Sequence, residues 1–322
     1  MTSFESVGDG VWRLPVPLPF ASPRSVNSYA FESGDGLILL DCGVASDDGL
    51  SILRSALDDL GQLSTLIGSH LHVDHIGGAA VLVAETGARW VMHDSTPDDV
   101  ASYNDWSIRT AVLAAAAAEN GAPDDFVTGL RNRFERPDWY GTAVDPTHPV
   151  SDGDRIALGP DRYLEVLYTP GHQRNHICLI DSRTGVLYSG DHVLPRISPF
   201  VPYSGPESDH LDDYLSSIDR IERGRHTLTH PAHGPEIERG SERAHQIRLH
   251  HERRLESMLE LLDERPTTAW RVMESTFRPN LNFLQQRLAF QETLAHLHYL
   301  DNTGRLRRGI DRGTIHYERT GR

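Results

Sequence analysis

The segment SHLHVDHIGG, residues 69–78, holds three histidines and an aspartate within six positions. Imidazole and carboxylate groups are donors that zinc and other first-row metals favour. His70 and His72 are two residues apart, so they share a face of an extended chain but would point apart on a helix. The spacing therefore predicts a pair of metal ligands at the end of a strand.

The four possible donors of this short segment cannot all bind the same ion. A first-row metal takes about four to six ligands in total, so the cluster suggests two neighbouring ions, with Asp74 and His75 facing the second. A surface cluster of histidines without metal is the alternative, and the donors found farther along the chain make it the weaker one.

The residues on either side of the cluster predict how it is positioned. The run LSTLIG before it is short, apolar and β-branched, as in a buried strand. Gly77 and Gly78 allow a close turn of the backbone, and the alanine-rich run 79–85 predicts a helix. We therefore expect the cluster on a loop between a strand and a helix.

Three single donors repeat this arrangement downstream. Each follows a predicted strand and one or more turn residues: His172 in TPGH, Asp191 in SGDH and His233 in HPAHG. A single histidine or aspartate in such a place is more often a turn or capping residue. Their recurrence after the first cluster predicts seven donors gathered at one edge of a sheet.

Composition excludes several classes of site. The 322-residue chain has a formal net charge of −15 and 31 basic residues, all of them arginine. The lack of lysine excludes a Schiff-base, P-loop or protein-kinase lysine. Cys42 and Cys178 lie in apolar strand-like runs, which predicts buried thiols rather than ligands. With no apolar run long enough for a bilayer and no visible signal peptide, we expect a soluble cytoplasmic protein.

The pattern of elements predicts two domains, residues 1–240 and 241–322. Strands and helices alternate in the first, interrupted by a helical insertion at about 96–141 that carries Trp106, Phe126, Trp139 and Tyr140. After about residue 240, charged helices precede a short hairpin rich in glycine and arginine, the outline of a winged-helix module.

The motif formed by His70, His72, Asp74 and His75, followed by His172, Asp191 and His233, resembles the metallo-β-lactamase superfamily. The resemblance covers most of residues 10–240 and implies an α/β fold, the αββα sandwich. It assigns His70, His72 and His172 to one ion and Asp74, His75 and His233 to the other. Asp191 would bridge the two ions, and Asp41 in LLDCG would support the site without binding metal.

The stretch TPGHQRNHICL resembles one branch of that family, the β-lactamase-like endoribonucleases and their bacterial hydrolase relatives. That branch also carries a winged-helix-like C-terminal module. His176 matches the second histidine of the stretch, whereas Arg174 and Asn175 replace the usual acidic pair. We therefore expect His176 and Arg174 to line the pocket or support the ligands rather than to bind metal.

The predicted chemistry is hydrolysis by a hydroxide that bridges two metal ions. Asp74 would accept the proton of the attacking water. Zinc suits the donors best, although iron and manganese also fit. We expect a small ester-like substrate (a thioester, lactone or ester), with the aromatic residues of the insertion either walling an apolar pocket or packing as an ordinary helix pair.

RNA cleavage is the alternative function. Residues 241–322 hold 14 arginines and 11 acidic residues, a net +3, which leaves 17 minus 35, or −18, for residues 1–240. Such an acidic domain repels a polyanion, although Arg305, Arg307, Arg308 and Arg312 could guide a strand. A winged-helix DNA-binding regulator is a third possibility. The long charged helix expected at 241–264 would suit either packing beside the active site or a homodimer.

Overall fold

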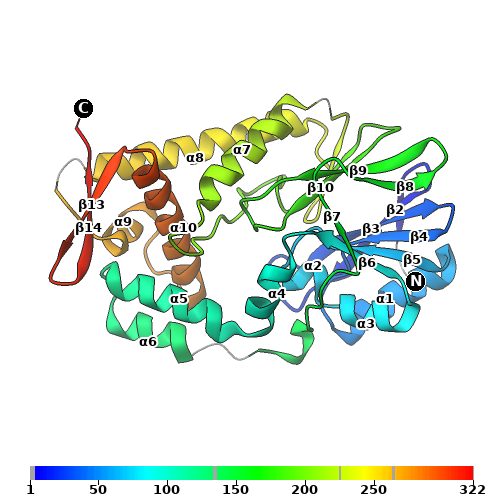
Figure 1. Cartoon of the computed structure of the whole chain (residues 1–322), viewed down its shortest axis with the longest axis horizontal. Helices are drawn as coiled ribbons and strands as arrows, with labels where there is room; N and C mark the ends of the chain where they lie inside the picture. Colours follow the sequence, from blue (N-terminus) through cyan, green and yellow to red (C-terminus); the bar gives the residue numbers. More distant parts are fainter. Residues whose placement is uncertain (1–3, 133–135, 225, 263–264, 322) are drawn as a thin grey trace.

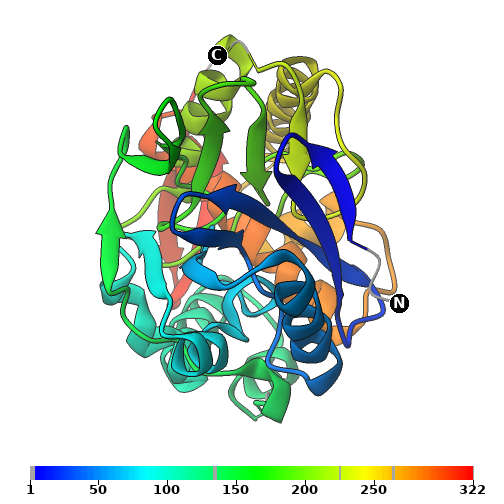
Figure 2. The same cartoon turned by 90° about the vertical axis from the view of Figure 1, so that its right-hand side faces the viewer.

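The computed structural model describes residues 4–132, 136–224, 226–262 and 265–321. Two sheets lie face to face with helices on their outer sides (Figures 1 and 2). The first sheet contains β1 (Glu5–Gly8), β2 (Val11–Pro17), β3 (Ser25–Ser33), β4 (Gly36–Leu40), β5 (Leu63–Ile67), β6 (Arg89–His93) and β7 (His148–Val150). The second contains β12 (Thr229–Pro231), β11 (Leu187–Gly190), β10 (Ile177–Asp181), β9 (Arg162–Tyr168) and β8 (Arg155–Gly159).

The order of strands explains how distant loops meet. In the first sheet β1 to β4 are antiparallel, whereas β4 to β7 are parallel neighbours, so the chain leaves β5 and β6 at the same edge. In the second sheet β11 and β12 are parallel, so the segments after them also share an edge. Ligands that follow β5, β11 and β12 are thereby brought together.

Helices cover the outer faces of both sheets. On the first lie α1 (Asp47–Leu60) and α3 (Ala79–Thr86), and on the second lies α7 (His210–Arg223) (Figure 1). Between the sheets, Phe31, Ile38 and Tyr188 belong to one buried cluster. Apolar side chains from both inner faces thus form the middle of the sandwich, and the predicted αββα architecture is confirmed.

Between β6 and β7 the chain forms a helical insertion, as predicted. It comprises α4 (Pro97–Asn104), α5 (Trp106–Glu119), α6 (Asp124–Asn132) and the 3₁₀ turn Asp138–Tyr140. The C-terminal part comprises α8 (Gly240–Leu262), α9 (Ala269–Thr276), α10 (Phe283–Asn302) and the hairpin of β13 (Leu306–Asp311) and β14 (Thr314–Arg319).

The insertion and the C-terminal part share one hydrophobic core. The ring of Phe126 on α6 lies 4.7 Å from that of Trp270 and 5.8 Å from that of Phe290. Tyr140 packs instead in the core under the first sheet, 5.0 Å from Trp106. Phe126 and Tyr140 therefore serve as packing residues, the simpler of the two roles considered for them. The division of the chain at residue 240 and the winged-helix comparison stay predictions.

Two further expectations concern exposure. Cys42 and Cys178 are free and fully buried, as predicted, and burial raises the pKa of the Cys178 thiol to about 12. Within the described residues, no helix has the length and apolar character needed to cross a membrane.

Candidate metal centre

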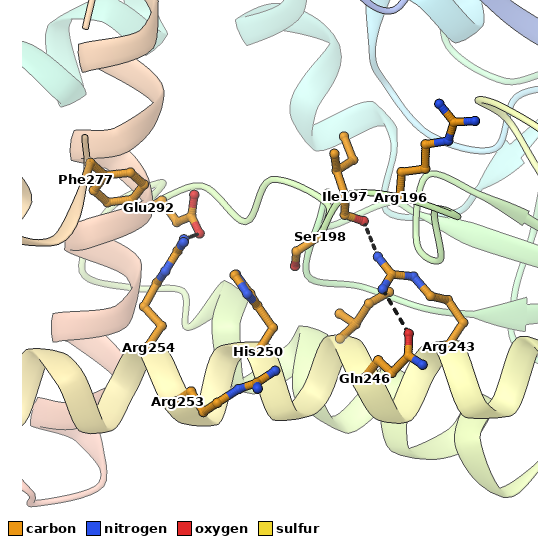
Figure 3. A pocket seen from close by; sticks show the side chains of 11 residues that line it. Arg196, Ile197, Ser198, Arg243, Gln246, His250, Arg253, Arg254, Phe277 and Glu292 are labelled. Atoms are coloured by element: carbon orange, nitrogen blue, oxygen red, sulfur yellow. Dashed lines mark hydrogen bonds and ion pairs between the residues drawn. The ribbon is translucent and has the colours of Figure 1, made fainter. Parts of the chain in front are cut away.

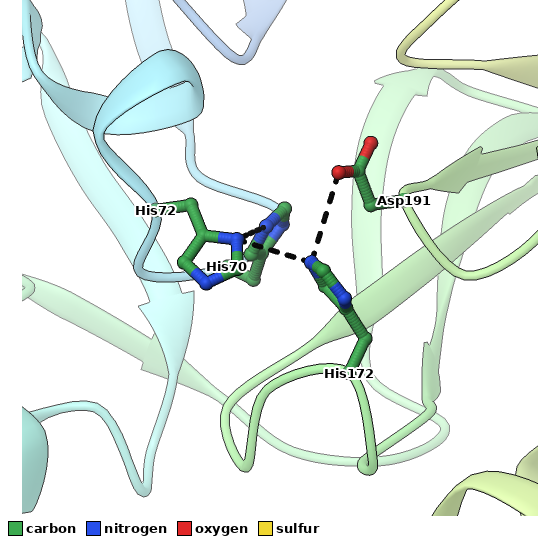
Figure 4. Close-up of side chains that lie close together, drawn as sticks. All are labelled: His70, His72, His172 and Asp191. Carbon is green, nitrogen blue, oxygen red and sulfur yellow. Dashed lines mark hydrogen bonds and ion pairs between the residues drawn. The ribbon is translucent and has the colours of Figure 1, made fainter. Parts of the chain in front are cut away.

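The seven predicted donors lie together in two adjoining groups. Within each group the donor atoms are all within 4.8 Å of one another. We call the seven residues the metal cluster. Figure 4 shows the first group, with its ring nitrogens and a carboxylate pointing toward one another. The first group is His70, His72, His172 and Asp191, and the second is Asp74, His75 and His233.

The local backbone places four of these donors on one short segment. After β5, His72 has extended geometry (φ −109°, ψ 151°) and begins the one-turn helix α2 (Val73–Ile76). The expected loop is therefore partly helical, and this turn places Asp74 and His75 in the second group, beside His233. A Cβ on Gly77 would lie 2.6 Å from the Val73 carbonyl oxygen, so only glycine fits the close turn after the helix.

Three imidazole nitrogens of the first group converge on one point. His70 Nε2 lies 2.9 Å from His72 Nδ1, and His172 Nε2 lies 3.0 Å from the same atom. Nitrogens bound to one zinc at about 2.0–2.1 Å would be roughly 3.3 Å apart. The three lone pairs therefore fit a shared cation with only small adjustments.

Four of the five histidines of the cluster are anchored through their other nitrogen. Such outer contacts orient a ligand and fix its tautomer. The anchors are Ser69 Oγ for His70 Nδ1 (3.0 Å), Asp41 Oδ2 for His75 Nδ1 (2.7 Å), the Phe200 carbonyl for His172 Nδ1 (2.6 Å) and the Ser25 carbonyl for His233 Nδ1 (2.8 Å). Gln173 Nε2 lies 2.6 Å from His72 Nε2, but both atoms are donors when His72 Nδ1 carries the lone pair, so this contact is not an anchor of that kind.

Asp191 lies between the two groups. Its Oδ2 is 3.6 Å from His172 Nε2, whereas its Oδ1 is 3.6 Å from His75 Nε2 and 3.4 Å from His233 Nε2. Both His75 Nε2 and Asp191 Oδ1 are buried without a hydrogen-bond partner among the described residues. Buried polar atoms normally have partners, so these two atoms mark a place suited to a cation.

The two groups of the metal cluster differ in the direction in which their histidine pKa values shift. Burial, reinforced by the neighbouring histidines, holds the pKa values of His70 and His72 well below their ordinary range, so both rings are neutral and free to bind metal. Burial also lowers the pKa of His75, but the carboxylates of Asp41, Asp191 and Asp74 outweigh it and hold that pKa well above its usual value. Carboxylates that favour a proton there would equally favour a metal cation.

The predicted supporting residues contact the donors as follows. Asp41 accepts hydrogen bonds from the Ser69 amide and hydroxyl (2.8 Å each) as well as contacting His75. His176 Nε2 accepts a hydrogen bond from the Asp191 amide (3.2 Å). Arg174 pairs with Asp98 at the start of α4. Asp41 and His176 thus hold donors of the metal cluster in place, whereas Arg174 ties the insertion to the TPGH loop.

Several contacts of the site had no clear signal in the sequence. Asn175 accepts a hydrogen bond from the Leu71 amide (2.9 Å) and donates one to Asp99 (3.0 Å), so it joins the first histidine loop to the insertion. Ser69 stands beside the histidine motif, and its hydroxyl could have been noticed there. The Phe200 and Ser25 carbonyls could not, because any residue supplies a carbonyl group.

Comparison with known proteins identifies the family. The metallo-β-lactamase superfamily matches residues 21–233, two-thirds of the chain. The chain belongs to that superfamily. A second family, described as the metallo-β-lactamase-like C-terminal domain, matches residues 255–320.

The chain has relatives that are named as hydrolases. It is 27% identical to a probable metallo-hydrolase, YqjP, of Bacillus subtilis over 91% of this chain and 92% of the relative. It is also 27% identical to the human acyl-coenzyme A thioesterase MBLAC2, over 67% and 74% of the two chains. A β-lactamase domain protein from Burkholderia ambifaria has a similar structure, with a TM-score of 0.84, 30% identity and coverage of 99% and 95%. The chain is therefore an enzyme, a metallo-hydrolase of this superfamily.

Proposed function

We propose that the protein is a dinuclear metal-dependent hydrolase of acyl thioesters. The observation that carries the proposal is the position of Asp191, whose two carboxylate oxygens face different groups of the metal cluster. A shared carboxylate of this kind suits a pair of ions better than one. Zinc is the metal that we propose first, because histidine and aspartate donors suit it.

The residues would act as follows. His70, His72 and His172 would hold one ion, Asp74, His75 and His233 the other, and Asp191 both. When bound, two such ions lower the pKa of a water and polarise the substrate carbonyl.

Asp74 is the proposed proton acceptor. Its carboxylate lies 3.3 Å from His233 Nε2. Burial raises its pKa, but His75 and His233 outweigh that effect and lower the pKa overall, so the group is ionised at neutral pH. An ionised carboxylate can both bind metal and receive a proton from the attacking water.

The choice of a thioester rests on two arguments. Relatives include the acyl-coenzyme A thioesterase and, at 23% identity over 66% of this chain and 38% of the relative, an atrochrysone carboxyl ACP thioesterase. A thiol also has a pKa of about 8.5, so a thiolate leaves the acyl group with little help from a general acid. The predicted lactone and ester substrates remain in the same chemical class.

Three of the four arginines expected to guide an RNA strand give little support to RNA cleavage. Arg307 pairs with Glu318 at 2.9 Å, Arg308 pairs with Asp301 at 2.6 Å, and Arg305 pairs with Glu256. These ion pairs reduce the net charge that the hairpin could offer to a phosphate backbone.

The test is turnover by zinc-loaded protein on acyl thioesters, lactones, aryl esters and labelled single-stranded RNA. We expect thioester hydrolysis that is lost in His72→Ala, with loss of bound metal. His148→Ala, which removes an exposed histidine outside the metal cluster, is the matched control and should retain activity. Cleavage confined to RNA, or full turnover by metal-free His72→Ala protein, would contradict the proposal.

A further inference from the structure

A cavity lies between α8, α10 and the segment 196–198 (Figure 3). Its volume is about 570 Å³, within the usual range for sites of small molecules. We call it the arginine cavity. It is lined by Arg196, Ile197, Ser198, Arg243, Gln246, Ile247, His250, Arg253, Arg254, Phe277 and Glu292.

The lining is strongly positive in a chain that is otherwise acidic. Four arginines face a single carboxylate, Glu292, which already pairs with Arg254. The hydrogen bonds of Arg243 go to uncharged oxygens: the Leu194 carbonyl (2.7 Å), the Ile197 carbonyl (2.8 Å) and the Gln246 side chain (3.3 Å). The net charge of the lining, four minus one, suits an anionic ligand.

A buried chain of hydrogen bonds holds one wall of the cavity. Ser198 Oγ lies 3.1 Å from His251 Nε2, and His251 Nδ1 lies 3.1 Å from His296 Nε2. The other nitrogen of His296 donates to the Glu292 carbonyl (2.7 Å). The segment that carries Arg196 and Ser198 is thereby fixed against α8 and α10, so this wall is formed before any ligand binds.

The same segment reaches the metal cluster. The stretch of chain from Asp191 to Phe200 contains this segment, and the carbonyl of Phe200 accepts the hydrogen bond from His172 Nδ1 (2.6 Å). Phe200 is the second residue after Ser198, so their Cα atoms are at most about 7 Å apart. A molecule bound in the arginine cavity would therefore lie one short stretch of chain away from a ligand of the metal cluster.

We propose that the arginine cavity binds the phosphate groups at the carrier end of a thioester substrate, while the acyl end reaches the metal cluster. This inference rests on the proposed thioesterase function. Guanidinium groups match phosphate oxygens through paired, charge-assisted hydrogen bonds. The carrier class is a nucleotide phosphate joined to the thiol by a flexible arm, as in coenzyme A.

The experiment compares two thioesters with the same acyl group. One is carried on coenzyme A and the other on N-acetylcysteamine, which has the thiol end without phosphates. The readout is the ratio of their kcat/KM values in zinc-loaded protein. We expect Arg253→Glu and Arg196→Glu, on opposite walls and both exposed, each to lower this ratio about tenfold, through KM for the coenzyme A ester.

Arg223→Glu is the matched control, because it makes the same charge change on α7, where the arginine is 78% exposed and pairs with Asp219. It should leave the ratio unchanged. If wild-type protein hydrolyses both thioesters and the two cavity variants keep the wild-type ratio, the phosphate site is wrong.

Equilibrium binding of coenzyme A alone separates this inference from the proposed function. We expect coenzyme A to bind the wild-type protein and to bind Arg253→Glu about tenfold more weakly, with inorganic phosphate a much poorer competitor. If no thioester is hydrolysed, the thioesterase proposal fails, yet selective loss of coenzyme A binding would still support the cavity. No binding by the wild-type protein, or equal binding by the variant, would overturn it.

Discussion

Buried histidines lie together at two places in this molecule: in the metal cluster as a whole, and beside the arginine cavity. In the first, carboxylates surround the rings: His75 faces Asp41 and Asp191. In the second, His251 and His296 face each other and neutral oxygens, with arginines nearby. Burial is nearly complete in both, so burial alone does not decide what a histidine does.

The neighbours decide the charge. Burial holds the pKa of His251 well below its ordinary value, and the neighbouring His296, His250 and Arg254 lower it further. At His75 three carboxylates overcome the same burial and raise the pKa. The first site thus attracts cations, whereas the second keeps neutral rings that serve as hydrogen-bond connectors next to a positive cavity.

The largest expected effect follows from removing carboxylates in or beside the metal cluster. Asp41→Asn alters only an outer partner, so metal affinity should fall about 10–100-fold. Asp191→Ala removes a donor that faces both groups, and its loss should exceed that range. Chelator competition with zinc, together with metal content per chain, measures both.

Asp58→Asn, on the exposed face of α1, is the control for the charge change and should bind zinc like wild type. Equal affinity in Asp191→Ala and Asp58→Asn would mean that Asp191 is not shared between two ions. Circular dichroism of the apo proteins checks that the fold persists.

The difference between the two histidine groups shows how far the sequence could lead. The metal cluster was predictable, because each donor follows a strand and the strands end at one edge. A signal for the arginine cavity also existed: Arg243, Ile247, His250 and Arg254 are spaced by four, three and four residues, which places them on one face of α8.

The sequence could not show what lies opposite that face. The segment 196–198 and Glu292 are brought there by tertiary packing, so the charged helix could equally have been a solvated surface. The same holds for Phe126, whose partners Trp270 and Phe290 lie more than a hundred residues away. Periodicity identifies a face of an element, but not its neighbour.

A smaller effect, on stability, should come from His296 beside the arginine cavity as pH falls. Burial lowers the pKa of His296 to about 3, compared with an ordinary value of 6.5. Between these values the unfolded chain binds a proton and the folded chain does not, so stability is lost as pH falls below 6.5. The His296→Leu protein has no imidazole at this position, so it does not lose stability in this way. The stability advantage of wild type should shrink by about 2–3 kcal/mol between pH 6.5 and 4.5.

Urea unfolding of zinc-loaded wild type and variant at several pH values gives this difference. Titration of the metal cluster affects both proteins alike and cancels. His148→Leu, at an exposed site, should follow wild type throughout. A wild-type advantage that stays constant with pH would mean that His296 titrates in the folded protein as it does in the unfolded chain.

The smallest effect is expected at the C-terminal hairpin, where an arginine is exposed and already paired. The side chains of Arg307 and Glu318 are 69% and 42% exposed, and such surface pairs contribute about 0.2–1 kcal/mol. Arg307→Ala should therefore change the free energy of unfolding by at most about 1 kcal/mol and leave thioester turnover unaltered. Chemical denaturation and the thioester assay measure these. If Arg307→Ala instead abolished a zinc-dependent cleavage of RNA, the hairpin would be guiding a polyanion. The contrast between a positive cavity and a partly neutralised hairpin would then be wrong.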